Sequence, residues 1–89
     1  MRNYEIKPSL KRILKKISKK DKISYEQILK KIEEIINSKD VNHYKNLKRP
    51  LQEFKRVHIK TSFVLTFKYI ESEDKIIFYH FGHHDEIYR

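Results

Sequence analysis

Residues that could carry chemistry gather at the end of this 89-residue chain, in Phe78–Tyr88, FYHFGHHDEIY, which holds three of the five histidines and the only glycine. A metal site, acid–base catalysis and a plain strand end are all compatible with this cluster. Adjacent residues on an extended chain point to opposite faces, so His83 and His84 are poorly placed to share an ion. No ligand spacing typical of zinc sites occurs either. We therefore predict no bound metal and no cofactor.

The residues around the paired histidines have simpler explanations. His80 alternates with bulky apolar neighbours, which predicts a packed or half-buried imidazole. Gly82 permits a backbone turn that other residues avoid, or the close approach of a ligand.

A second group of polar residues is spaced at every other position. Arg56, His58 and Lys60 alternate with apolar residues in FKRVHIK, and on a strand they project from one face, about 6.6–7 Å apart. A row of cation, imidazole and cation suits a bound phosphate chain. The alternative is an edge strand that charge protects from aggregation.

The charge balance supports a polyanionic partner. The chain carries 21 Lys+Arg against 12 Asp+Glu, a formal net charge of +9. Such a field attracts RNA, DNA, an anionic membrane or an acidic protein, although single lysines on helices are more often simply solvated. No stretch approaches the roughly 20 apolar residues of a membrane span, and MRNYEIK does not resemble a signal peptide. With no Cys present, we expect a cytoplasmic protein.

Metal-independent RNA cleavage needs a base for the 2′-hydroxyl, an acid for the 5′-oxygen and cations near the phosphate. Histidine suits both proton transfers because its ordinary pKa is about 6.5. The parts are present in His58, His84, Arg56, Lys60 and Tyr88.

The first half of the chain must supply the support for these residues. Residues 3–6 alternate as a short strand before Pro8. Apolar residues recur with helical spacing over about 9–18 and 24–37, with Ser9 as the first cap and Ser24 and Gln27 at capping-box spacing. The short polar connection between them predicts an antiparallel helix pair.

From residue 51 the apolar period changes to two. Strands are expected over 54–60, 63–70 and 76–81, with a tight reversal at 61–62 and an acidic turn at 71–75. The last strand is apolar on both faces and is expected to be central. Residues 38–50 are a loop that Leu47 and Leu51 anchor. The order β-α-α-β-β-β predicts an α+β domain, two antiparallel helices on a mostly antiparallel sheet, over residues 1–89.

The second half resembles the RelE/ParE superfamily of toxins, the archaeal RelE branch in particular. The resemblance is carried by residues 47–51, LKRPL, by the strands FKRVHIK and SFVLTFKY, and by the ending Gly82-His-His-Asp-Glu-Ile-Tyr88. The element order matches as well, so nearly the whole chain is covered. The combination of length, order, charge and ending is specific, although no single motif is.

This resemblance implies a toxin that cleaves mRNA in the ribosomal decoding site without metal and that a wrapping acidic antitoxin, RelB-like, neutralises. It also implies that Tyr88 contacts a substrate base. The chain departs from the family at Val64 and His84, where relatives usually carry arginine. His58 and His84 then either supply proton transfer, as in histidine-using relatives such as YafQ and YoeB, or mark a weak toxin. Lys48, Arg49 and Lys68 are candidate substitutes for the cation missing at Val64.

We accordingly predict a ribosome-dependent mRNA endoribonuclease whose partners are an antitoxin, mRNA in the ribosomal A site and rRNA, with no membrane. The predicted catalytic residues are His58, His84, Arg56 and Tyr88. The predicted RNA-binding residues are Lys48, Arg49, Lys55, Arg56, Lys60, Lys68 and His83. A gyrase inhibitor like ParE, which cleaves nothing, and a non-toxic protein that only holds an antitoxin are the alternatives.

Overall fold

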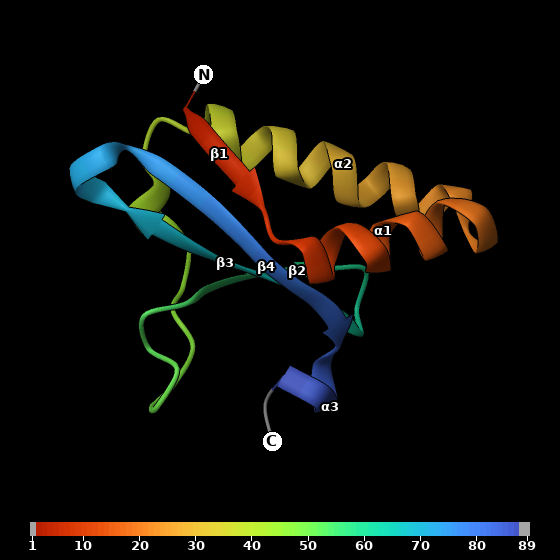
Figure 1. Cartoon of the computed structure of the whole chain (residues 1–89). Helices are drawn as coiled ribbons and strands as arrows, with labels where there is room; N and C mark the ends of the chain where they lie inside the picture. Colours follow the sequence, from red (N-terminus) through yellow and green to blue (C-terminus); the bar gives the residue numbers. More distant parts are fainter. Residues whose placement is uncertain (1, 88–89) are drawn as a thin grey trace.

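The computed structural model describes residues 2–87 of the chain (Figure 1). The elements follow in the order β1 Asn3–Ile6, α1 Pro8–Lys20, α2 Lys22–Asn37, β2 Lys55–Ile59, β3 Phe63–Ile70, β4 Lys75–His83 and α3 His84–Ile87. Two single 3₁₀ turns, Val41–His43 and Glu71–Glu73, lie in the connections. The predicted β-α-α-β-β-β order is thereby confirmed, and α3 is an addition that the sequence did not indicate.

The helix pair begins and ends differently from the prediction. Pro8 opens α1 at its first position, where a missing N–H costs nothing, and the side chain of Ser9 is not the cap. One residue, Asp21, separates the helices, and its carboxylate accepts from the backbone N–H of Ser24 at 3.1 Å and from its hydroxyl at 2.6 Å. Asp21 is therefore the cap of α2, in place of the predicted Ser24.

The sheet is mixed, with the strand order β1-β4-β3-β2. The pairs β2–β3 and β3–β4 are antiparallel, whereas β1 runs parallel to β4. β4 therefore lies between two strands, which confirms its predicted central place and explains its two apolar faces. β2 lies at an edge.

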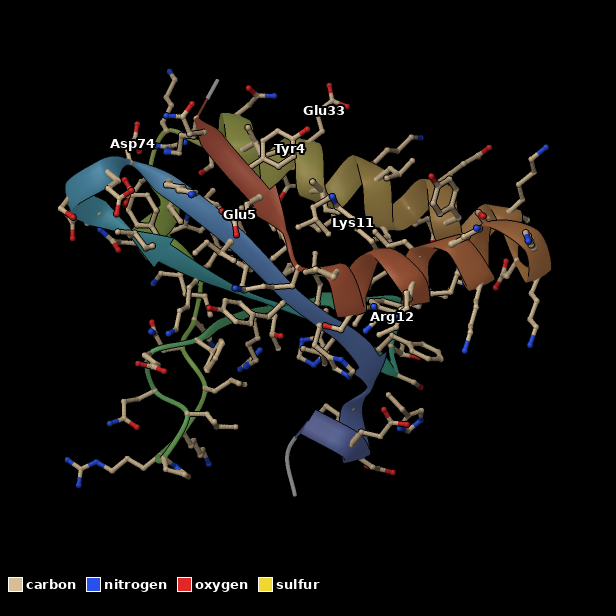
Figure 2. All side chains as sticks on the ribbon, in the orientation of Figure 1. Tyr4, Glu5, Lys11, Arg12, Glu33 and Asp74 are labelled. Carbon is tan, nitrogen blue, oxygen red and sulfur yellow. The ribbon has the colours of Figure 1, made fainter. Side chains whose placement is uncertain are left out.

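Helices α1 and α2 cover one face of the sheet and enclose the core (Figure 1). Lys11 and Arg12 extend from the outer side of α1 (Figure 2). The fully buried side chains that fill this layer include Leu10, Ile28, Ile35, Leu65, Phe67, Ile76 and Phe78. Within residues 2–87, no helix has the length and apolar character needed to cross a bilayer.

The opposite face of the sheet, which we call the open face, is covered only in part, by the segment 44–54 and by α3 (Figure 1). Leu47 is buried and confirms its predicted role as an anchor. Leu51 remains 41% exposed, so the prediction that it anchors the loop is wrong. Asn46 pairs with Lys55, and the Arg56 N–H donates to the Lys45 carbonyl, which holds this segment against β2.

Candidate functional site

Strand β2 brings two of the predicted site residues to the open face. Its residues alternate, so Val57 and Ile59 pack toward the core while Arg56 and His58 project from the other side. Lys60 does not continue that row, because β2 ends at Ile59 and Lys60 has a left-handed backbone, φ 59°. Its ammonium lies 3.8 Å from the Asp21 carboxylate, on the helical side. The predicted row of three cooperating residues is therefore wrong in its third member.

His84 joins His58 from a different element. The His84 N–H donates to the Ser62 carbonyl at 2.7 Å, which places the first residue of α3 beside the β2–β3 turn. The imidazoles of His58 and His84 consequently stack, with ring centroids 5.8 Å apart and an angle of 25° between their planes. The two histidines predicted to transfer protons thus lie together on one face.

Arg56 completes this arrangement. Its guanidinium donates to Nδ1 of His58 at 3.4 Å, and because arginine only donates, that nitrogen is an acceptor. Partial burial, followed by the charges of Arg56 and His84, lowers the pKa of His58 below its ordinary value. The geometry and the electrostatics both favour a neutral imidazole at His58.

His83 and His84 diverge, as their adjacency predicted. The His83 ring makes an edge contact with Phe63, at 5.6 Å between centroids, whereas His84 lies against His58. The carboxylate of Asp85 is 3.7 Å from each of the two imidazoles. Within residues 2–87, no group of three or more His, Cys, Asp or Glu side chains could hold a metal ion.

Lys55 is a correction among the predicted RNA-binding residues. It lies on the core side of β2, only 7% exposed, and its ammonium donates to the Tyr44 carbonyl at 3.2 Å and to Oδ1 of Asn46 at 3.1 Å. A buried lysine that satisfies two oxygens of the neighbouring segment is structural, so it has no access to a phosphate. The alternation of β2 was sufficient to indicate this.

The remaining predicted cations lie on or near the open face. Lys48 and Arg49 are exposed in the loop before β2. Lys68 lies over the rings of Phe54 and Tyr79, at 5.1 and 5.6 Å, and pairs with Glu53 at 3.2 Å. Tyr88 lies outside the described residues, so its predicted contact stays a prediction.

Val64 stands where the family resemblance predicts an arginine. Val64 is fully buried, and it lies in the row of the sheet between His58 on β2 and Gly82 on β4. His58 begins this row, and His84 stacks against it on the open face.

Gly82 lies inside β4 with an ordinary strand backbone, so it is not the turn that one interpretation allowed. Its lack of a side chain has another use. A Cβ placed there would lie 2.7 Å from Oε2 of Glu86 and 2.8 Å from Nε2 of His80. Gly82 therefore lets these two polar groups approach each other above the strand.

The proximity of His80 and Glu86 was missed at the sequence level. His80 is half-buried, as predicted, but it belongs to the same face as Arg56, because Arg56, Thr66 and His80 are cross-strand neighbours. Simple alternation along β4 would place His80 on the core face with Phe78, and a register shift between Thr66 and Phe67 moves it to the open face, which no sequence pattern indicated. The position of Glu86 depends on α3, which no pattern indicated.

A separate apolar cavity lies on the helical side of the sheet, with a volume of about 330 Å³. Its apolar lining comes from Ile13, Ile17, Ile59, Phe63 and Phe81, and Lys16, Lys20 and Lys60 lie at its rim. Phe63 is 37% exposed although it stacks on Phe81 at 5.4 Å. Asp21 also lines this cavity and lies 3.8 Å from the Lys60 ammonium, so the rim of the apolar cavity carries three lysines and one carboxylate.

Comparison with known proteins finds a family and a relative that are both described as toxins. Residues 4–88 match the family described as the ParE toxin of the type II toxin–antitoxin system parDE. A Methanocaldococcus jannaschii protein described as "Putative toxin RelE4" is 53% identical over 89 residues, which cover 100% of this chain and 93% of that protein.

Two solved structures share the fold at low sequence identity. A metal-bound toxin from Helicobacter pylori superposes with a TM-score of 0.78 at 21% identity, covering 98% of this chain and 99% of that one. The intact E. coli RelBE toxin–antitoxin complex gives a TM-score of 0.72 at 15% identity, covering 93% and 96%. These likenesses confirm the predicted α+β fold.

Proposed function

This chain belongs to the ParE toxin family of type II toxin–antitoxin systems, and from that premise we propose that it is a RelE-type endoribonuclease that cleaves mRNA in the ribosomal A site. The observation that carries the proposal is the stacked pair of His58 and His84 with Arg56 beside it on the open face. A protein that only held an antitoxin would have no need for two adjacent imidazoles on a basic surface.

In the proposed reaction His58 is the base. Its neutral ring takes the proton of the RNA 2′-hydroxyl, and the resulting oxygen attacks the adjacent phosphorus. The bond from phosphorus to the 5′-oxygen breaks, and His84 gives that oxygen a proton. The products are a 2′,3′-cyclic phosphate and a free 5′-hydroxyl.

Arg56 has two positions in this scheme. Without RNA it donates to Nδ1 of His58 and helps to hold that ring neutral. When a phosphate arrives, the guanidinium turns to its oxygens, which it matches in geometry, and stabilises the negative charge that builds there. Nδ1 is then free to accept the proton.

Other cations bind the RNA chain in this proposal. Lys48, Arg49 and Lys68 border the open face, and Lys60 and His83 serve segments of RNA or rRNA that pass the helical side. Tyr88 stacks on a base. Lys55 is left out because it is buried.

The antitoxin is the second proposed partner. The E. coli relative is solved as an intact toxin–antitoxin complex, and here the open apolar cavity with its lysine rim suits an apolar side chain on an acidic segment. The cavity lies on the other face of the sheet from His58 and His84. Substitution of Lys16 and Lys20, which have no assigned role in RNA binding, should therefore separate antitoxin binding from RNA cleavage.

Gyrase inhibition is the rival function, because the matching family is named for ParE. The decisive experiment expresses the chain alone and measures both outcomes: new 5′ ends on ribosome-bound mRNA, and the topology of a plasmid. We expect mRNA cleavage and normal supercoiling. Relaxed plasmid with intact mRNA would select gyrase inhibition instead.

Substitutions test the assigned residues in the same assay. Arg56→Ala and His84→Ala should each lower the cleavage rate at least about a hundredfold, as expected for one proton-transfer or charge-stabilising group. His43→Ala is the matched control, because His43 is exposed in the loop after α2 and remote in sequence from the open-face strands. Full activity in both test variants would refute the site.

A further inference from the structure

The open face carries a cleft that the proposed cleavage step does not use. Its volume is about 390 Å³, and its lining includes Leu47, Leu51, Phe54, Thr66, Tyr79, His80 and Glu86. We propose that this cleft binds a guanine base of the RNA and that Glu86 determines the preference for guanine. This inference rests on the proposed RNA cleavage, and it names a base specificity for it.

The walls of the cleft supply affinity without a preference. The rings of Phe54 and Tyr79 meet at 90° with centroids 5.0 Å apart, so their faces are directed differently and a base can stack on one of them. The ammonium of Lys68 lies 5.1 Å from one ring and 5.6 Å from the other. Every base has a flat face, and a nearby cation attracts the phosphate of any nucleotide.

The polar end of the cleft discriminates. The absent side chain of Gly82 lets Oε2 of Glu86 and Nε2 of His80 approach within 2.7 and 2.8 Å of one point. A carboxylate only accepts hydrogen bonds, whereas a histidine ring nitrogen can donate one. The cleft therefore offers a double acceptor beside a donor.

Guanine is the base that matches this pattern. It presents two adjacent donors, the N1–H and the N2 amino group, next to the O6 acceptor. Cytosine and adenine present one amino donor beside an acceptor nitrogen, which would face a carboxylate oxygen unfavourably. Uracil presents a single N–H between two carbonyl oxygens. Only guanine engages both oxygens of Glu86 and leaves O6 for His80.

The cleft is also correctly placed relative to the cleavage residues. His80 is in register with Thr66, which is in register with Arg56, and the neighbouring row runs from His58 through Val64 to Gly82. Adjacent strands are about 4.8 Å apart, so the cleft lies within two strand spacings of Arg56. One nucleotide can bridge that separation, so the selected base flanks the cleaved phosphate.

Cleavage of ribosome-bound mRNAs that differ in one A-site base tests the proposal. Each of the three A-site bases is varied in turn. At the position whose base enters the cleft, guanine should give cleavage by the native chain roughly tenfold faster than adenine, cytosine or uracil, which is typical for one two-point base contact. Glu86→Gln replaces one acceptor oxygen by a donor, so the preference should fall below about twofold while cleavage of the other codons is kept. Glu71→Gln makes the same charge change in the β3–β4 turn and should keep the preference.

Three results would overturn the inference: no guanine preference in the native chain, an unchanged preference in Glu86→Gln, or an equal loss on all four bases. The last would indicate a structural role, or a cleft occupied by an apolar side chain of a protein partner.

Binding of mononucleotides separates this inference from the proposed cleavage. Titration of the native chain with GMP, AMP, CMP and UMP, followed by amide NMR signals, holds the phosphate constant and varies the base. We expect the lowest Kd for GMP, with signals of Thr66, His80 and Glu86 moving most. A lower Kd for GMP without any mRNA cleavage would refute the cleavage proposal and support guanine binding in the cleft. Cleavage of mRNA with four equal Kd values would support the cleavage proposal and refute guanine binding.

Discussion

The imidazole rings of His58 and His84 stack 5.8 Å apart at 25°, although one residue lies on the edge strand β2 and the other opens α3. The backbone bond from His84 to the Ser62 carbonyl brings α3 to this position. We therefore expect the proposed cleavage to depend on the β2–β3 turn as much as on the histidines themselves.

The first prediction concerns pH. A base must be neutral, and the pKa of His58 is lowered by partial burial and by the charges of Arg56 and His84. The acid-side limb of the pH dependence of the cleavage rate, measured at saturating ribosomes, reports the protonation of the base, so its midpoint should lie below pH 6.5, the ordinary histidine value. Removing the Arg56 charge in Arg56→Gln should move that midpoint upward, toward the ordinary value, besides lowering the rate. A midpoint that stays in place in the variant contradicts the assignment of His58 as the base.

The second prediction concerns Lys55. Lys55→Met removes the donor to the Tyr44 carbonyl and to Asn46, so two oxygens lose a partner. The free energy of unfolding, measured by urea denaturation, should fall by about 1–3 kcal/mol. Lys45→Met, at an exposed position in the same segment, should change it by less than about 0.5 kcal/mol. If Lys55→Met weakened RNA cleavage while stability was kept, Lys55 would bind RNA after all.

The third prediction compares two helix caps. Asp21→Ala should lower the thermal midpoint by several degrees, because the first turn of α2 loses the acceptor of the Ser24 N–H. Ser9→Ala should leave it unchanged, since Ser9 makes no capping bond to α1. Bonds from Ser24 and the charge of Lys60 lower the pKa of Asp21, so its contribution is present above the ordinary value of 3.8 and is lost as the pH falls through the lowered one. Equal midpoints for the two variants at pH 7 would exclude Asp21 as the cap.

The fourth prediction separates antitoxin binding from cleavage. Reversing the charges of Lys16 and Lys20, at the rim of the apolar cavity, should slow association with the proposed acidic antitoxin by at least tenfold at low salt. Reversal of Lys15 and Lys19 makes the same change in net charge on α1, away from that rim, and should have a smaller effect. Cleavage of mRNA by both variants should remain. Equal slowing in both would mean that only the overall charge attracts the antitoxin.

Periodicity predicted the elements of this fold well, because it reports which side chains must leave water. The strand predicted over residues 63–70 has the same bounds as β3. The central place of β4 in the sheet was predicted from its two apolar faces. The observed helix boundaries differ from the predicted ones where two neighbouring side chains could each cap the helix. At the start of α2, Asp21 is the cap in place of the predicted Ser24.

The candidate site was predicted in part. Arg56, His58 and His84 were identified from residue type and from family resemblance, and the structure places them together. Lys60 leaves the row because a left-handed backbone turns it toward Asp21. His80 and Glu86 were missed because their approach depends on the space above Gly82 and on a helix of four residues.

The sequence by itself determined the α+β class and the basic character, and it identified the histidines as candidate proton carriers, because composition and period are properties of the chain alone. Only the tertiary structure decided which of these side chains meet. That decision depends on strand register and on the path of short turns, where a hydrogen bond such as that from His84 to Ser62 selects one arrangement among several that the same pattern allows.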